Sequence, residues 1–243
     1  MDTVEVYETA GHRVTIACRD GVGVPTPYSL FLAEHIPALA GQTVVDLGTG
    51  SGFLAVVAKL QGAVRVYLLD THPAAVAVAL ENAERNGVLD GLVPLSIGPS
   101  MIPLPAGERV DCIICNPAQL PLPEPERAHS PFYAGPDGRL MIEGLIREAP
   151  QRLAADGTLL MTHNSLADWR ASERLMRSEG LEPHVLAERT LEFRPFIDRA
   201  WLDQLGGTGR GLYTVRNGLA YETLYVVQAR LRSAGGPASS PRA

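Results

Sequence analysis

The stretch that most constrains this chain is Thr43 to Gly52, which reads TVVDLGTGSG. An apolar run ends at Asp46, glycines follow at every second position, and a new apolar run fills 53–60. That order predicts a buried strand, a tight turn and the first turn of a helix. Glycines spaced in this way let a flat or charged ligand lie on the main chain, beside the unpaired N–H groups of the helix start. We therefore expect a cofactor-binding loop in an α/β fold.

The glycine spacing separates several cofactor classes. A dinucleotide fingerprint would need glycine at the position of Phe53. No Gly-Lys-Ser/Thr sequence follows, which excludes a P-loop. A nicotinamide dehydrogenase would therefore have to bind NAD despite Phe53. A strand-to-helix turn that holds no ligand is the structural alternative.

A second strand is predicted over Val64–Leu69, and it ends in Asp70. A carboxylate at this strand end can accept hydrogen bonds from both hydroxyls of a ribose. The alternative is a surface aspartate that caps the helix predicted over Pro73–Asn86.

A third strand is predicted over Leu92–Ile97 and a fourth over Val110–Cys115. Asn116-Pro117 follows the fourth strand. Ligands of doubly wound sheets lie outside the carboxyl ends of the strands, so Asn116 should share an edge with the glycine-rich loop and with Asp70. The Asn116 oxygen and the Pro117 carbonyl can accept hydrogen bonds from the two N–H groups of an amide or an exocyclic amine. These acceptors would aim the nitrogen lone pair at the reacting carbon. The alternative is an ordinary turn at a strand end.

The ordered set DLGTGSG, Asp70 and NPAQ resembles the class I S-adenosylmethionine-dependent methyltransferases. Asn116-Pro117 resembles the Asn-Pro-Pro-Tyr signature of their HemK-like branch, in which the second Pro is here Ala118 and the Tyr is Gln119. The resemblance implies a doubly wound, mainly parallel seven-stranded sheet with an antiparallel C-terminal hairpin. It also implies that Asn116 and Pro117 are the catalytic residues and that S-adenosyl-L-methionine binds to Asp46, Gly48, Thr49, Gly50, Gly52 and Asp70.

Further site residues are expected around this set. Thr26 and Ser29 begin a helix and could contact the methionine carboxylate or close the substrate pocket. Related enzymes often bind the adenine amino group with an acidic residue, and Ser100 stands at that place here. The substrate-contact candidates are Gln119, Phe132, Tyr133 and His163, and a capping role is the alternative for the histidine.

The chain is expected to have three parts. Residues 1–40 form a hairpin (Val4–Glu8 with Arg13–Cys18) and a helix over Leu30–Leu39, residues 41–232 form the methyltransferase core, and 233–243 form a disordered tail. The core should end in an edge strand over Glu182–Phe193, an insert over 194–210 that lids the substrate or forms a dimer contact, and a hairpin of Arg210–Arg216 with Leu219–Arg232.

Composition limits the partners and the compartment. The formal charge of −6 opposes non-specific nucleic-acid binding, which needs a basic face. Cys112 and Cys115 have redox spacing but sit in an apolar strand, where positions three apart face opposite sides of a sheet, so both are expected in the core. No signal peptide, membrane span or metal cluster is evident, which predicts a soluble, cytoplasmic protein without a metal.

The sequence thus predicts a methyltransferase that methylates a planar nitrogen. HemK-like release-factor enzymes carry a helical N-terminal domain, whereas residues 1–42 precede the loop here, so the plan is nearer to the single-domain relatives. These act on proteins, nucleic-acid bases or small metabolites, and the sequence does not choose among them. A small-molecule O- or C-methyltransferase is the first alternative, which the loss of the Tyr at Gln119 favours. A cofactor-binding module without catalysis is the second.

Overall fold

The computed structural model describes residues 3–19, 21–97, 100–122, 133–193, 198–207 and 209–232. Its centre is a sheet of strand order β5-β4-β3-β6-β7-β10-β8. The parallel strands are β3 (Thr43–Leu47), β4 (Arg65–Asp70), β5 (Leu92–Ser96), β6 (Val110–Cys115) and β7 (Leu153–Asn164). The antiparallel strands are β10 (Leu219–Leu231) and β8 (Leu181–Glu192), and the short β9 (Thr214–Arg216) pairs with β10. The prediction of a mainly parallel, seven-stranded sheet is confirmed, with β9 as an addition at one end.

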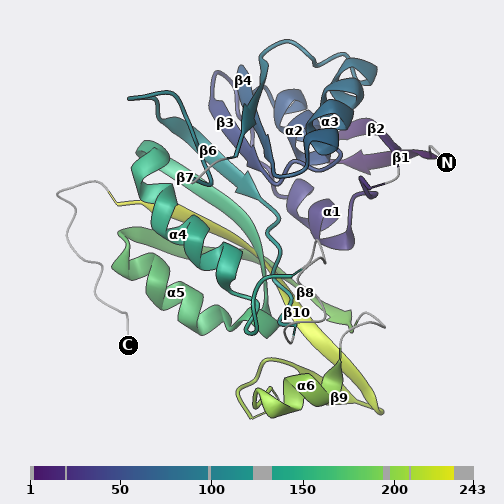
Figure 1. Cartoon of the computed structure of the whole chain (residues 1–243), viewed down its shortest axis with the longest axis vertical. Helices are drawn as coiled ribbons and strands as arrows, with labels where there is room; N and C mark the ends of the chain where they lie inside the picture. Colours follow the sequence, from purple (N-terminus) through teal and green to yellow (C-terminus); the bar gives the residue numbers. More distant parts are fainter. Residues whose placement is uncertain are drawn as a thin grey trace.

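Helices cover both faces of the sheet (Figure 1). The helices α1 (Pro27–Ala33), α2 (Phe53–Leu60) and α3 (Pro73–Arg85) pack on one face, and α4 (Leu140–Arg152) and α5 (Trp169–Ser178) pack on the other. Each face has its own hydrophobic core. Cys112 belongs to the first core and Cys115 to the second, which confirms that these two thiols point to opposite sides of the sheet.

The N-terminal hairpin forms as predicted, from β1 (Thr3–Thr9) and β2 (His12–Cys18). It packs against α2 and α3. The helix predicted over Leu30–Leu39 is wrong in its bounds, because α1 ends at Ala33. Pro37 explains the early end, because a proline has no N–H to donate to the carbonyl four residues earlier, that of Ala33, and its ring clashes with that carbonyl. The division into residues 1–40 and 41–232 stays a prediction.

The C-terminal third contains the predicted edge strand, β8, and a hairpin shorter than predicted. Residues 210–213 lie outside the strand, so β9 has three residues. The short helix α6 (Arg199–Gln204) packs with β10 around Leu202 and Tyr213, and Figure 1 shows α6 and β9 at the end of the molecule away from α3. The predicted tail, 233–243, and positions 194–197 and 208 of the predicted insert lie outside the described residues.

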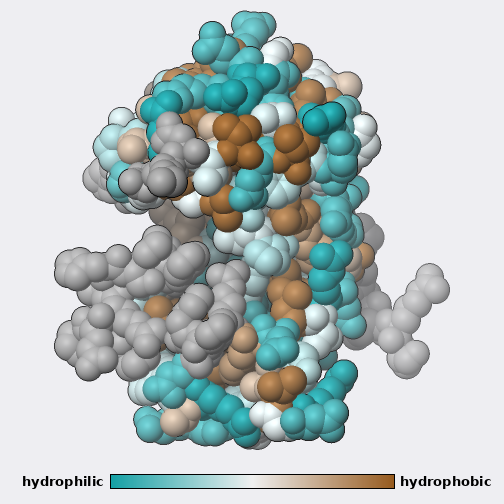
Figure 2. Space-filling view, turned by 90° about the vertical axis from the view of Figure 1, so that its right-hand side faces the viewer, coloured by the Kyte–Doolittle hydropathy of each residue, from teal (hydrophilic) through white to brown (hydrophobic). Residues whose placement is uncertain are grey.

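Two surface features bear on the partners of the protein: the polarity of its helices and the distribution of its exposed hydrophobic residues. In the described ranges, every helix is too short or too polar to cross a bilayer. On the described part of the face in Figure 2, hydrophobic residues form a broken row between hydrophilic ones rather than one patch. A homodimer therefore stays a prediction.

Candidate functional site

The carboxyl ends of β3 and β4 carry the predicted cofactor residues and are joined by backbone hydrogen bonds. The N–H groups of Gly48 and Thr49 donate to the Leu69 carbonyl at 2.8 and 2.9 Å. The N–H of Gly50 donates to Oδ2 of Asp70 at 2.9 Å. The structure therefore brings the glycine-rich loop and Asp70 together at one edge of the sheet.

The three glycines of this loop all have positive φ, at 76°, 51° and 79° for Gly48, Gly50 and Gly52. A Cβ built on Gly48 would lie 3.9 Å from Cε of Met141, and one built on Gly50 would lie 4.0 Å from the Gly48 carbonyl oxygen, so both would make only ordinary van der Waals contact. A Cβ on Gly52 would lie 2.7 Å from the Cα of Ala79 in α3. Gly48 and Gly50 therefore keep side-chain atoms off the loop without close packing, and Gly52 lets α3 pack against it.

Asp46 is buried under the same loop. Its Oδ2 accepts hydrogen bonds from Oγ1 of Thr49 at 2.7 Å and from the N–H of Ala55 at 3.1 Å. Its Oδ1 has no partner among the described residues. Burial raises the pKa of this carboxyl to about 7, the Asp70 charge adds to the rise, and the bond from Thr49 opposes it. The raised pKa means that burial disfavours the ionised carboxylate. A positively charged ligand held by the loop would stabilise that ionised form.

Asp70 is half-buried and each of its oxygens accepts one backbone hydrogen bond. Oδ2 accepts from Gly50, and Oδ1 accepts from the N–H of His72 at 2.9 Å. A carboxylate oxygen has two lone pairs, so each keeps one acceptor site. The two backbone bonds thus hold the Asp70 carboxylate in place, and its oxygens can still accept hydrogen bonds from two hydroxyls of a ribose.

Asn116 follows β6 on the same edge and is half-buried. Its Nδ2 donates to Oγ of Ser29 at 2.9 Å and to Oγ1 of Thr26 at 3.3 Å. Its Oδ1 accepts from Oγ1 of Thr162 at 2.7 Å. Thr26 is also the N-cap of α1. The predicted residues Thr26 and Ser29 therefore anchor the Asn116 amide, and their contact with a cofactor stays a prediction.

Gln119 points into the protein rather than into open space, with an exposed fraction of 3%. Its Oε1 accepts from the N–H of Asn164 at 2.6 Å, and its Nε2 donates to Oγ1 of Thr162 at 3.0 Å. The described contacts therefore place Gln119 behind Asn116 as a supporting residue, and the substrate contact stays a prediction. Thr162 was missed, because a threonine within an apolar strand looks like an ordinary β residue.

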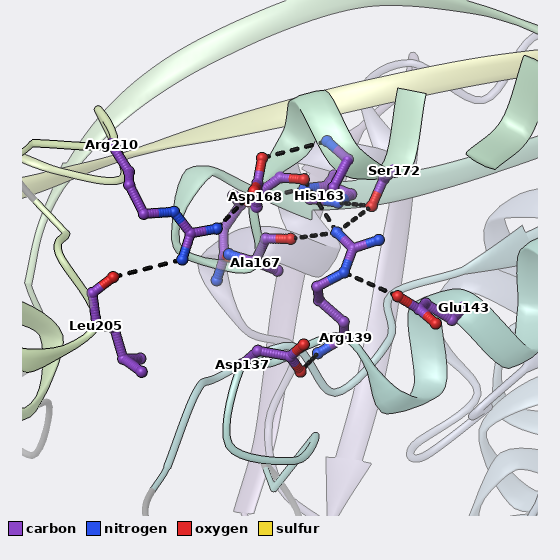
Figure 3. A network of polar contacts seen from close by, with 11 residues as sticks. Asp137, Arg139, Glu143, His163, Ala167, Asp168, Ser172, Leu205 and Arg210 are labelled. Carbon is purple, nitrogen blue, oxygen red and sulfur yellow. Dashed lines mark hydrogen bonds and ion pairs between the residues drawn. The ribbon is translucent and has the colours of Figure 1, made fainter. Parts of the chain in front are cut away.

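His163 lies next to Thr162 but on the other side of the sheet, with an exposed fraction of 0%. Its Nδ1 donates to the carbonyl of Asn164 at 2.7 Å, so Nε2 accepts from Oγ of Ser172 at 2.8 Å (Figure 3). Burial lowers the pKa of the imidazole to about 4. His163 is thus a buried, neutral residue with both ring nitrogens engaged, and its substrate contact stays a prediction.

The same network fixes the start of α4 against α5 (Figure 3). Nη1 of the buried Arg139 donates to the carbonyls of Ala167 and Asp168 at 2.7 and 3.0 Å and to Oγ of Ser172 at 2.9 Å. Asp168 in turn forms an ion pair with Arg210, at 2.6 Å. These contacts hold the start of α4 against the start of α5, and no sequence pattern predicted them.

The remaining candidates are less informative. The Ser100 hydroxyl donates to Glu148, whose Oε2 also accepts from the N–H of Met101 at 2.9 Å, so this serine already has a structural partner and its adenine contact stays a prediction. Tyr133 forms a β-bridge with Leu120 and packs against the buried cluster that contains Leu120, so its substrate contact stays a prediction. Phe132 lies outside the described residues. Across the described ranges, no three His, Cys, Asp or Glu side chains converge as a metal site.

One further residue was missed, Asn82 of α3, which is fully buried. Its side chain pairs with the backbone of Ala17 in β2, accepting at 2.8 Å and donating at 2.9 Å. It also donates to the carbonyl of Ser51 in the glycine-rich loop at 2.9 Å. Asn82 therefore ties the N-terminal hairpin to the loop.

Comparisons with known proteins agree with this geometry. The family model described as Ribosomal protein L11 methyltransferase (PrmA) matches residues 24–172. A Methanocaldococcus jannaschii protein, provisionally named a protein N5-glutamine methyltransferase, is 26% identical over 182 residues, which cover 73% of this chain and 90% of that protein. A release factor glutamine methyltransferase of Gloeobacter violaceus is 39% identical over 152 residues, which cover 57% of this chain and 52% of that enzyme.

The solved structures give the same fold. The T. thermophilus 16S rRNA N2 G1207 methyltransferase, solved with AdoMet and guanosine, has a TM-score of 0.58 at 19% identity, over 96% of this chain and 51% of that one. The expected resemblance to class I methyltransferases of the HemK-like branch is thereby confirmed. The chain belongs to the family described as ribosomal protein L11 methyltransferase (PrmA), and it is a class I S-adenosyl-L-methionine-dependent methyltransferase.

Proposed function

We propose that the protein methylates the side-chain amide nitrogen of a glutamine in another protein. The observation that carries this proposal is the Asn116 carboxamide, which is held at the edge of the sheet and whose Oδ1 accepts one hydrogen bond from the described residues, that of Thr162. That oxygen keeps one lone pair for an N–H of an incoming amide. The names of two relatives, both glutamine methyltransferases, support the same acceptor.

The chemistry explains why such a site needs acceptors rather than a strong base. The lone pair of an amide nitrogen is delocalised, so this nitrogen is a weak nucleophile. S-adenosyl-L-methionine supplies a methyl group on a positively charged sulfur. Asn116, together with the carbonyl of Pro117, would hold the two N–H groups and direct the lone pair toward that methyl group. Positioning and electrostatics then supply most of the rate.

The cofactor residues fit a positively charged ligand. Asp46 and Asp70 place two carboxyls beside the loop, and Gly48 and Gly50 keep side-chain atoms off its surface. Asp70 would accept the ribose hydroxyls with its remaining lone pairs. Gly48, Thr49 and Gly50 would lie under the ligand, and Gly52 would keep the loop close to α3.

The proposal is tested by methyl transfer from labelled S-adenosyl-L-methionine to a peptide-chain release factor and to ribosomal protein L11. We expect label on a glutamine side chain, located by fragmentation mass spectrometry. Asp70→Ala should weaken S-adenosylhomocysteine binding by about 2 kcal/mol in a calorimetric titration, because a charged hydrogen-bond partner is lost. Label on an amine, an oxygen or a carbon would contradict the amide acceptor. Unchanged binding by Asp70→Ala would contradict the ribose contact.

The pH dependence of cofactor binding is expected to report on Asp46. Its pKa of about 7 in the free protein means that the carboxyl is partly protonated near neutral pH. A cationic ligand favours the ionised form, so its binding releases a proton. We therefore expect the dissociation constant of S-adenosyl-L-methionine to fall at least about threefold from about pH 6 to about pH 8, measured by calorimetry.

Asp46→Asn is the matched control, because it keeps the shape and removes the charge. The folded-state pKa lies above the ordinary value of 3.8, so ionisation opposes folding, and this cost is absent below about pH 3.8 and complete above about pH 7. Asp46→Asn should thus have a larger free energy of unfolding than wild type at about pH 8. Its dissociation constant for S-adenosyl-L-methionine should not fall between about pH 6 and about pH 8. His163 contributes an opposite slope between about pH 4 and 6.5, so variant and wild type are compared at each pH. A trend that persists in Asp46→Asn would contradict this assignment.

A further inference from the structure

A continuous row of side-chain hydrogen bonds lies directly behind Asn116. It begins at the backbone N–H of Asn164 and passes through the amide of Gln119 and the hydroxyl of Thr162 before it reaches Oδ1 of Asn116. The three distances are 2.6, 3.0 and 2.7 Å. Gln119, Thr162 and Asn164 are 3%, 0% and 0% exposed, so water does not compete for these bonds.

The direction of the row is fixed at its buried end. A backbone N–H can only donate, so the group of Gln119 that faces Asn164 must be the oxygen. The other half of that amide, the NH₂ group, must then face Thr162 and donate to it. The Thr162 hydroxyl accepts from Gln119 and has one proton to donate, which it gives to Oδ1 of Asn116.

The same direction determines which half of the Asn116 amide faces which neighbour. Oδ1 faces the donating hydroxyl of Thr162, and Nδ2 faces Ser29 and Thr26, whose hydroxyls can both accept. A turn of this amide by half a circle would present Nδ2 to Thr162, so the buried Thr162 proton would lose Oδ1 as its acceptor. The wrong orientation is therefore penalised by the row itself.

We propose that Gln119 and Thr162 are positioning residues that lock the Asn116 amide with its oxygen toward the methyl acceptor. This inference rests on the proposed function, in which that oxygen accepts an N–H of the substrate. An Asn116 amide in the reverse orientation would present N–H groups to the substrate N–H and repel it. Gln119 thus acts through Thr162 and Asn116 and need not touch the substrate.

Kinetic variants test the role in catalysis. Thr162→Val has nearly the same shape but no hydroxyl, so kcat should fall by about tenfold or more, while the acceptor KM and the affinity for S-adenosylhomocysteine change by less than about threefold. Thr162→Ser restores the hydroxyl and should recover most of kcat. Equal activity of the valine and serine variants would overturn the proposal.

Gln119→Glu is the sharper test, because an ionised glutamate has the shape of glutamine but only accepts. The Thr162 hydroxyl should then donate to the glutamate, and the Asn116 amide should turn so that Nδ2 donates to Thr162. We expect kcat to fall at least tenfold at about pH 8 and to recover on acidification, since a protonated carboxyl donates again. The wild type is the control, and its kcat should not rise when the pH is lowered over the same range.

The orientation itself can be measured without any methyl acceptor. In nuclear Overhauser spectra, the Nδ2 protons of Asn116 should lie near the β-protons of Ser29 in the wild type and near the methyl group of Thr162 in Gln119→Glu. Wild-type proximity to Thr162 would overturn the proposal even if the protein methylates glutamine. The expected spectra without methylation of any amide would instead overturn the proposed function and leave the orientation established.

Discussion

Asn116→Ala is expected to lower kcat for methyl transfer by about 10²- to 10³-fold, the usual effect of removing one preorganised hydrogen-bonding group from a reacting centre. The amide oxygen that would hold the substrate N–H is lost, and a cavity opens beside Thr162 and Ser29. Asn116 makes no described contact with the glycine-rich loop, so S-adenosylhomocysteine should bind within about threefold of wild type. Single-turnover kinetics and calorimetry measure the two quantities.

Asn116→Asp is the matched control for this experiment. Aspartate keeps an acceptor in the place of Oδ1, and the hydroxyls of Ser29 and Thr26 can turn to donate to its other oxygen. It should therefore retain more activity than the alanine variant. Activity of Asn116→Ala near that of wild type would contradict the assigned role, as would an aspartate variant no better than alanine.

Gly52→Ala is expected to lower the free energy of unfolding by about 3 kcal/mol. About 1–2 kcal/mol comes from placing a side chain at φ 79°, and the rest comes from a Cβ that would lie 2.7 Å from Ala79 in α3. The added carbon meets backbone and not the end of a flexible side chain, so the helix itself must move. Denaturant unfolding monitored by circular dichroism gives this value.

Gly50→Ala is the control that separates folding from binding. Its φ is also positive, at 51°, but the nearest atom to an added Cβ is 4.0 Å away. We expect a loss of only about 1–2 kcal/mol of stability together with a large loss of S-adenosylhomocysteine affinity, because the methyl group would occupy the loop surface on which the ligand is proposed to lie. If Gly50→Ala binds normally, or if both variants are equally stable, the division of roles between the two glycines is wrong.

The sheet and the position of the site could be predicted because both depend on local signals. The runs that became β3, β4 and β6 are mostly apolar, as expected of strands buried on both faces. Polar residues directly after such runs must lie at one edge of a parallel sheet. That argument alone places Asp70 and Asn116 near the glycine-rich loop.

The supporting residues could not be predicted, because their partners are set by tertiary contacts. Thr162 and His163 are neighbours in β7, and strand geometry sends them to opposite faces of the sheet. Which of the two faces Asn116 depends on the register between β6 and β7, which the sequence does not state. We chose the histidine for its chemistry, and the threonine is the one in contact. Gln119 was placed correctly beside the site, but its direction depends on Asn164, 45 residues later.

The bond between Asn82 and the glycine-rich loop has a consequence for how the site comes into being. The Asn82 side chain pairs with the backbone N–H and carbonyl of Ala17 as a neighbouring strand would. The two residues are 65 positions apart. Closing so long a stretch of chain is slow compared with forming a local turn. The loop 48–52 therefore gains its bond from Asn82 only when α3 has packed on it, and the N-terminal hairpin joins the same residue over a longer stretch of chain. The support of the cofactor loop thus depends on contacts between parts of the chain that are distant in the sequence.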